Sequence, residues 1–144
     1  MKKFKYRLQK VLDVKEMVLK KTQRDLHMAQ TEQEQADTRL HEMKSSLEDY
    51  RRNLDGSRRE TAGGLRMQYG YFYQLLDDVD LQQQEVAKKA ANVHTIRERL
   101  TDEQRGRKIL AKLKEKSFED YSRQVNKDEQ IFLDEISLSP MRRK

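Results

Sequence analysis

The residue types that most often carry chemistry are present in this 144-residue chain, but their spacing forms no catalytic or metal site. There is no cysteine, which excludes a disulfide, a thiolate metal site and a cysteine nucleophile. His27, His41 and His94 stand apart, with no histidine or cysteine at ligand spacing. No phosphate-binding glycine loop, nucleophile elbow or zinc-protease motif occurs. We therefore expect no enzymatic activity, no metal and no cofactor.

The composition leaves two structural classes open, disorder and long paired helices. The chain is 39% charged and only 35% hydrophobic, which is too polar for an ordinary globular core. High charge favours disorder, but the signs nearly cancel to +6, proline occurs once, and strong helix formers dominate. No apolar run could span a membrane, and residues 1–12 contain no signal-peptide core. We expect a soluble, cytoplasmic protein.

Apolar residues in the first half recur with the 3.5-residue spacing of a left-handed coiled coil. Eleven of fourteen positions taken at alternating steps of three and four are apolar or aromatic. This predicted seam consists of Leu8, Leu12, Lys15, Leu19, Thr22, Leu26, Ala29, Gln33, Ala36, Leu40, Met43, Leu47, Tyr50 and Leu54.

A second seam follows from residue 72, but it is clean only at its two ends. Its positions are Phe72, Leu76, Val79, Gln83, Val86, Ala90, Val93, Arg97, Leu100, Gln104, Arg107, Ala111, Lys114, Phe118, Tyr121, Val125, Asp128, Phe132 and Glu135. Between residues 97 and 114 most positions are polar, and local shifts to Ile96, Leu110 and Leu113 would improve the pattern. The register of that stretch stays open.

Four of the five glycines fall between the seams, and the pair Gly63-Gly64 is the expected chain reversal. Pro140 is expected to end the second helix. The predicted fold class is all-α: a long antiparallel two-helix coiled-coil hairpin in a single domain, 1–144. Its predicted parts are helices at about 3–55 and 67–138, a glycine-containing turn at 56–66 and a basic tail at 140–144. Because the second helix is longer, one of its ends should project alone.

Charge is segregated along the chain, and the segregation predicts which segments face each other. Residues 1–24 carry a net charge of +7, and 25–50 carry −5. Residues 97–118 carry +4, and 119–135 carry −4. In a hairpin we expect the basic start beside the acidic 119–135, and the acidic 25–50 beside the basic 97–118.

Basic residues also gather near both ends of the chain. Lys3, Arg7 and Lys10 are spaced to lie on one side of a helix, and a folded-back chain would bring the basic tail to the same end. Such an end could bind an acidic protein surface or nucleic acid, although a basic run is most often a solvated face. The acidic segments predicted alongside argue against a continuous phosphate-binding track, so we expect no nucleic-acid partner.

Four aromatic residues lie within five positions just after the predicted turn, at Tyr69, Tyr71, Phe72 and Tyr73. Consecutive residues face different sides of a helix, so they cannot all enter one seam. Phe72 fits the seam, whereas Tyr69 and Tyr73 form a second stripe. Partner binding and local packing at the hairpin tip are both open.

The two ends of the chain resemble the FliJ family of the flagellar type III export apparatus. Residues 4–16, FKYRLQKVLDVKE, match the family's opening aromatic-x-aromatic-Arg-Leu-x-x-Val-Leu pattern, and 129–135, EQIFLDE, resemble its closing Glu-x-x-x-x-Asp-Glu signature. Residues 113–116, LKEK, followed by Tyr121 also fit. The resemblance implies a non-enzymatic antiparallel coiled coil, similar to the gamma subunit of rotary ATPases. Such a protein binds the export ATPase FliI and promotes its ring assembly and activity. It also contacts the cytoplasmic domain of the export-gate protein FlhA, and it escorts export chaperones.

Carried over by position, the resemblance implies two binding regions and a place at the cytoplasmic face of the inner membrane, at the flagellar base, without membrane insertion. The ATPase-binding candidates are Lys3, Arg7, Lys10, Arg142, Arg143 and Lys144. The export-gate candidates are Tyr69, Phe72, Tyr73, Leu76 and Val79. The alternatives are the equivalent stalk protein of a virulence injectisome, a coiled-coil nucleic-acid-binding protein, and a structural spacer or homodimerising tether.

Overall fold

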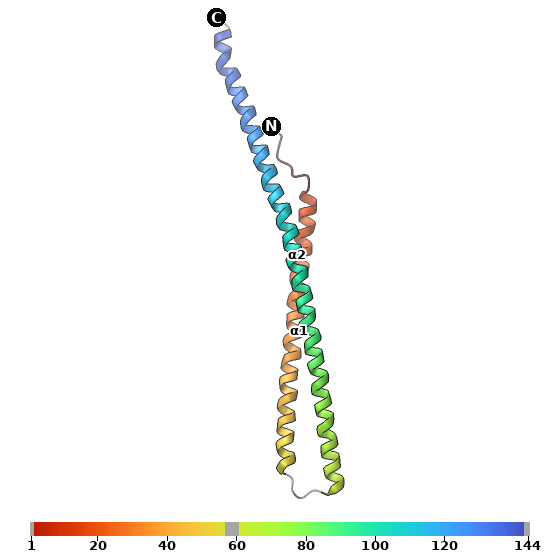
Figure 1. The fold of residues 1–144 in the computed structure, drawn as a ribbon. Helices are drawn as coiled ribbons and strands as arrows, with labels where there is room; N and C mark the ends of the chain where they lie inside the picture. The colour runs from red at the N-terminus through yellow and green to blue at the C-terminus, as the bar shows by residue number, and fades with distance from the viewer. Residues whose placement is uncertain (1, 57–60, 143–144) are drawn as a thin grey trace. The chain divides into compact units, whose positions relative to one another are not determined.

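The described chain consists of two long helices joined by a short connection. The computed structural model describes residues 2–56 and 61–142, with side chains for 2–54 and 61–139. Helix α1 spans Gln9–Gly56, and helix α2 spans Ala62–Arg142 (Figure 1). Across the described residues there is no strand. The predicted fold class, an all-α antiparallel helical hairpin, is confirmed.

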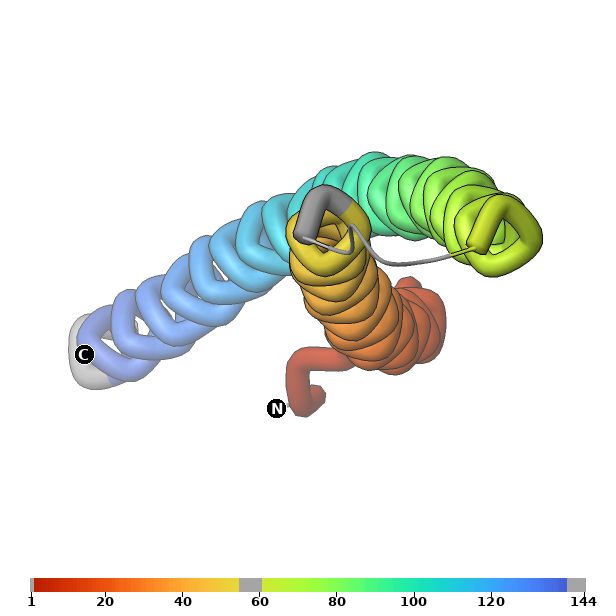
Figure 2. The backbone as a smooth tube through the Cα atoms, turned by 90° about the horizontal axis from the view of Figure 1, so that it is seen from below, coloured from red at the N-terminus to blue at the C-terminus, as the bar shows by residue number. Residues whose placement is uncertain are grey.

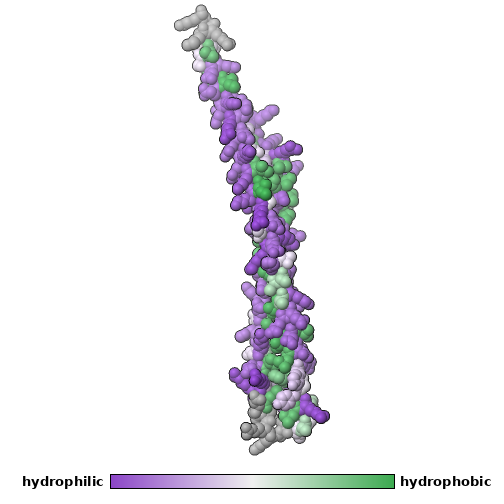
Figure 3. Space-filling view, in the orientation of Figure 1, coloured by the Kyte–Doolittle hydropathy of each residue, from purple (hydrophilic) through white to green (hydrophobic). Residues whose placement is uncertain are grey.

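The hairpin divides into two compact units, each of which contains a piece of both helices. The terminal unit comprises residues 1–21 and 101–144, and the loop unit comprises residues 22–100. Within each unit the helices pack along one narrow strip. Figure 3 shows polar side chains over most of the visible face, with hydrophobic side chains in narrow strips. Neither unit therefore has the closed core of a globular domain.

The seam predicted for the first helix is confirmed at nearly every position. Leu12, Leu19, Ala29 and Ala36 are buried, as is the polar member Thr22. The remaining positions are half-buried except Lys15, whose side chain is exposed. A lysine can lie along an apolar strip and still place its ammonium group in water, so one lysine does not break the seam.

The seam of the second helix is confirmed at most positions between residues 72 and 125 and displaced at others. The half-buried residues that fit the prediction are Phe72, Leu76, Val86, Ala90, Leu100, Ala111, Lys114, Tyr121 and Val125. Val79 and Val93 are buried as expected. At four other positions, however, the half-buried residues are Gln82, Ile96, Glu103 and Ser117, whereas the predicted Gln83, Arg97, Gln104 and Phe118 are exposed. At these four positions the seam therefore lies one residue before the predicted position.

The suggested local shifts toward Ile96 and Leu110 are confirmed, since both are half-buried, but Leu113 is exposed. The register that places Ile96 in the seam turns the arginine beside it, Arg97, toward solvent. Burying an apolar side chain and solvating a charged one both favour this arrangement. Among the polar residues that it brings inward, Gln82 makes a hydrogen bond across the helices, as described below.

The second helix begins earlier than the glycines predicted. Thr61 caps it: its hydroxyl accepts a hydrogen bond from the Gly64 amide at 3.2 Å, and its carbonyl accepts one from the Leu65 amide at 2.9 Å. Gly63 and Gly64 therefore lie in the first turn of α2, and the expected reversal at this pair is wrong. Residues 57–60 lie outside the described chain. At its other end α2 runs through Pro140 to Arg142, so the expectation that Pro140 ends the helix is wrong by two residues.

Contacts between the helices place like-charged segments beside each other. Arg99 pairs with Asp25 at 3.1 Å in the loop unit, and Arg107 pairs with Glu16 at 3.7 Å in the terminal unit. The acidic 25–50 therefore lies beside 71–96, which is also acidic, and the expected pairings of opposite charge are wrong. Exposed ion pairs contribute about 0–1 kcal/mol each, which is too little to override burial of the seam.

A glycine in the middle of α2 gives a direct test of helix packing. At Gly106 an added methyl group would lie 3.4 Å from the Nζ atom of Lys15, the movable end of a long side chain. We expect Gly106→Ala to raise the free energy of unfolding by about 0.5–1 kcal/mol, because alanine restricts the unfolded chain and favours helix. Urea titration followed by circular dichroism measures this change.

Gly70→Ala is the matched control, since nothing lies within 4 Å of the methyl group it would add. Both variants should gain stability. A loss at position 106 together with a gain at position 70 would show that Lys15 needs the glycine.

Candidate partner-binding surfaces

The residues before α1 form an arm that packs on α2. The ring of Phe4 lies 5.2 Å from that of Phe118 and 5.4 Å from that of Tyr121. The Tyr6 hydroxyl donates a hydrogen bond to the Leu110 carbonyl at 3.1 Å, and the Tyr121 hydroxyl donates one to the Lys2 carbonyl at 2.5 Å. The aromatic residues of the opening motif thus fix the arm to the second helix.

This arm changes the arrangement of the first three ATPase-binding candidates. Lys3, Arg7 and Lys10 are all exposed, as binding residues should be. However, α1 begins at Gln9 instead of about residue 3, so Lys3 and Arg7 precede the helix and the predicted alignment on one helical side is wrong. Packing of the arm's aromatic residues outweighs the weak helix propensity of a chain end.

Arg142, the first arginine of the basic tail, does not join these residues. Tyr121 contacts Lys2, and α2 continues from there for 21 residues to Arg142, a rise of about 30 Å. Figures 1 and 2 both show the C-terminal part of α2 running past the N-terminal arm. The predicted single positive end is therefore wrong, because the second helix outlasts its partner. Arg143 and Lys144 lie outside the described residues.

A larger basic surface occupies the paired part of the terminal unit. Residues 2–21 carry eight lysines and arginines against two acidic residues, and residues 101–118, which lie alongside, carry six against three. We call this pair of segments the basic shaft. Sequence reasoning missed it because the assumed register placed each of these segments beside an acidic one.

Beyond the arm, α2 forms a C-terminal overhang, which we define as residues 126–139. Every side chain in it is exposed. Five of them are large and apolar, with exposed fractions between 50% and 62%: Ile131, Phe132, Leu133, Ile136 and Leu138. The overhang also carries four acidic residues and one basic residue. The unequal helix lengths predicted a projecting end, and the structure identifies it as this segment.

The aromatic cluster of the loop unit divides between packing and exposure. Tyr71 packs edge-on against Tyr50, with ring centroids 5.0 Å apart, and the Tyr50 hydroxyl donates a hydrogen bond to the Gln68 carbonyl at 3.2 Å. All three tyrosines remain exposed, Tyr69 at 48%, Tyr71 at 51% and Tyr73 at 63%, but no ring contact is seen for Tyr69 within the described residues. This arrangement leaves a tyrosine stripe free for contact beside a packed pair.

The other export-gate candidates lie nearer the seam. Phe72 and Leu76 are half-buried, and Val79 is only 7% exposed. Val79 thus offers almost no surface to a partner, whereas Phe72 presents part of its ring beside that of Tyr73, with centroids 6.0 Å apart. A partner would reach the two tyrosines first, then Phe72 and Leu76.

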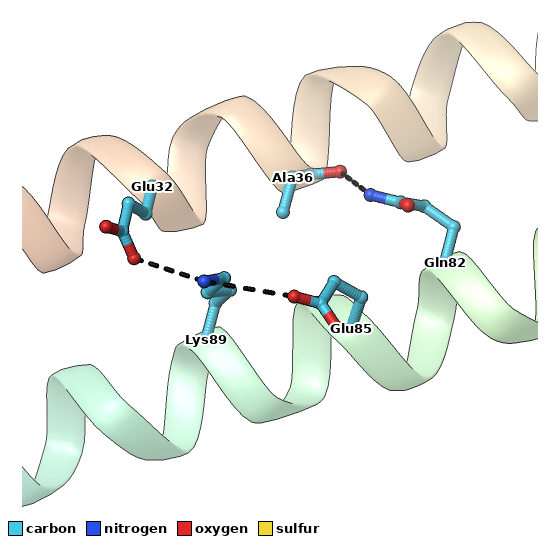
Figure 4. A network of polar contacts seen from close by, with 5 residues as sticks. All are labelled: Glu32, Ala36, Gln82, Glu85 and Lys89. Atoms are coloured by element: carbon cyan, nitrogen blue, oxygen red, sulfur yellow. Dashed lines mark hydrogen bonds and ion pairs between the residues drawn. The ribbon is translucent and has the colours of Figure 1, made fainter.

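A polar network crosses the seam in the loop unit (Figure 4). The Gln82 amide donates a hydrogen bond to the Ala36 carbonyl at 3.0 Å, and Lys89 pairs with Glu32 at 3.1 Å and with Glu85 at 3.8 Å. The hydrogen bond to Glu32, with the negative charges of Glu32 and Glu85, raises the pKa of Lys89. Lys89 therefore stays protonated at neutral pH, and the network links the two helices across the seam.

The described residues contain no group of three or more histidine, aspartate or glutamate side chains placed to hold a metal ion. Within the same described part, neither helix is long and apolar enough to cross a membrane. The surfaces that stand out are thus the basic shaft, the overhang and the tyrosine stripe, all of which suit contact with other macromolecules.

The arm's aromatic contacts can be tested by truncation. We expect Phe4→Ala to lower the free energy of unfolding by about 1–3 kcal/mol, because it removes two ring contacts and part of the arm's buried area. Hydrogen exchange should also speed up at the first amides of α1. Lys5→Ala, an exposed change in the same arm, should leave both quantities nearly unchanged. Equal effects of the two changes would contradict a structural role for the ring.

The comparisons with known proteins agree with this architecture. The sequence matches the family model described as flagellar FliJ protein over residues 4–144, almost the whole chain. No curated protein and no solved structure matches it. The match includes both the packed arm and the C-terminal overhang. The chain therefore belongs to the FliJ family, a non-catalytic component of the flagellar export apparatus.

Proposed function

We propose that this protein binds the export ATPase FliI through its terminal unit and promotes assembly and activity of the ATPase ring. The observation that carries the proposal is the basic shaft, where two basic segments lie side by side and Lys3, Arg7 and Lys10 are exposed. Two adjacent basic strips create a positive potential that attracts an acidic protein surface and speeds association. Family membership supports the choice of an export partner over an unrelated acidic protein.

Charge reversal on the shaft tests this role. We expect Arg7→Glu with Lys10→Glu to reduce stimulation of FliI ATP hydrolysis at least about tenfold, since two like charges then face the partner. The matched control is Arg39→Glu with Lys44→Glu, which reverses two exposed charges in the loop unit. Unchanged stimulation by the shaft variant, or equal loss in the control, would contradict binding through the shaft. Circular dichroism checks that helicity is kept.

We propose that the tyrosine stripe of the loop unit contacts the cytoplasmic domain of the export-gate protein FlhA. Tyr69 and Tyr73 are exposed at i and i+4, with the exposed part of Phe72 and Leu76 beside them. Aromatic side chains that stand in water on a thin helix are typical anchors of protein interfaces. The same protein would thereby connect the ATPase to the gate.

Truncation of this stripe tests the gate contact. We expect Tyr69→Ala with Tyr73→Ala to weaken binding to the FlhA cytoplasmic domain by about 1–3 kcal/mol, roughly five- to 150-fold, measured by calorimetry. Leu81→Ala, which removes another exposed large side chain of the loop unit, should leave affinity unchanged. Loss of helicity in step with loss of binding would assign the tyrosines to packing instead.

We also propose escort of export chaperones and peripheral residence at the flagellar base, on family membership alone. The match favours the flagellar apparatus over a virulence injectisome. Nucleic-acid binding is the second candidate function, because the two basic segments of the shaft lie beside each other and not beside the acidic segments expected from the sequence. DNA affinity that falls steeply with salt would favour it, and absence of binding at moderate salt would dismiss it.

A further inference from the structure

The terminal unit carries a second apolar surface, which borders its seam at Lys15 and Glu103. Val11, Val14 and Val18 recur at i, i+3 and i+7 on α1, and Val14 is 57% exposed. They line a groove of about 440 Å³ together with Lys10, Lys15 and, from α2, Glu103. Three valines on one helical face, with lysines at the edges, have the width and shape to receive another helix.

The overhang presents the complementary helix. Phe132 and Ile136 lie at i and i+4 on one face, which continues the α2 seam from Val125. In the described structure the arm reaches only as far as Tyr121, through Lys2, so this part of the seam faces solvent. Asp128, Glu129 and Glu135 flank it. The overhang is thus apolar with acidic edges, whereas the valine groove is apolar with basic edges.

Within one chain these two surfaces cannot meet. The Glu16–Arg107 ion pair places the valine groove level with residue 107 of α2, while Phe132 lies 25 residues further along the same helix. At 1.5 Å per residue that separation is on the order of 37 Å. The overhang can therefore reach a valine groove only on another molecule.

We propose that this protein forms an antiparallel dimer with a second copy of itself, in which each overhang lies in the valine groove of the other copy. A two-fold axis crossing α2 near residues 119–120, midway between 107 and 132, brings both overhangs into both grooves at once. The contact is then isologous and closes at two chains, without growing into a fibre.

Charge complementarity favours the overhang of a second copy as the occupant of the valine groove. In the dimer, each overhang with four acidic residues and one basic residue lies on a basic shaft with fourteen basic and five acidic residues. Within a single chain the overhang faces no such surface. The attraction is between partly exposed groups, so the dimer should weaken as salt rises.

Solution mass tests the proposal first. Sedimentation equilibrium from low to high micromolar concentration should show a shift from one chain to two. Phe132→Glu with Ile136→Glu should abolish the dimer, whereas Ile131→Glu with Leu138→Glu, equally exposed residues on another face, should retain it. A single-chain mass at every concentration would overturn the proposal, as would equal behaviour of the two variants. Circular dichroism should show the same helicity for both.

A charge exchange identifies the paired surfaces. Lys10→Glu with Lys15→Glu makes the groove acidic, and Asp128→Lys with Glu135→Lys makes the overhang basic. Each variant alone should be monomeric, because both of its contacts then join like charges. An equimolar mixture should form a heterodimer, because both contacts then join opposite charges. A mixture that stays monomeric, or single variants that dimerise normally, would count against this pairing.

Cross-linking fixes the geometry, since the chain has no native cysteine. Val14→Cys in one copy and Phe132→Cys in a tagged second copy should form a disulfide between chains on oxidation, since the two-fold axis places Phe132 level with Glu16 of the other copy. Met17→Cys with Leu138→Cys is the control pair and should not. If the Phe132 and Ile136 variant loses FliI binding while the wild type shows only one-chain mass, the overhang is a site for the ATPase and the dimer is wrong.

Discussion

Burial of one narrow apolar seam is the constraint on which the rest of this structure depends. Two helices alone cannot surround a core, so each contributes a single strip of side chains, and only a few residues become fully buried. The register of α1 against α2 must then be fixed by whatever makes the strip fit. Aromatic contacts near both ends of the paired region, at Phe4 and Tyr50, and the Gln82 and Lys89 network between them meet that need.

The register of α1 against α2 decides which charged segments lie side by side. The charges do not decide the register. Once Ile96 enters the seam and Tyr6 reaches Leu110, the basic 2–21 must lie beside the basic 101–118. Exposed charges in water repel weakly, and salt screens them over about 8–10 Å, so this cost is small beside the burial of leucines and aromatic rings. The uncompensated positive charge of the two segments gives the terminal unit a positive electrostatic potential. That potential is a property that a partner with acidic groups can use.

The sequence was sufficient for the fold class and for the first seam, because period 3.5 over many turns is a strong signal. It was insufficient for the second seam, where residues such as Glu103 and Ser117 occupy inner positions and Phe118 is exposed. Hydrophobicity alone cannot predict that a polar residue will occupy a seam position while the apolar residue next to it packs elsewhere. Phe118 illustrates this, since it leaves the seam in order to contact Phe4.

The candidate sites were partly predictable for the same reason. Local features such as the tyrosine stripe depend on helix periodicity, so Tyr69 and Tyr73 lie outward as their spacing predicts. The predicted single positive end required both helices to end at the same level. They do not, because the arm delays the start of α1 to Gln9. Residues 2–8 use their length to pack across α2 instead of extending α1.

The same arm explains why the overhang stands alone. The face of α2 that carries Tyr121 and Val125 continues through Phe132 and Ile136, yet the described first helix has no residues left to cover it. Water-facing apolar residues on this face contribute nothing to the stability of a lone hairpin. Their presence is accounted for if another helix completes the strip. The unequal lengths of the two helices then leave half of an interface exposed at one end of the hairpin.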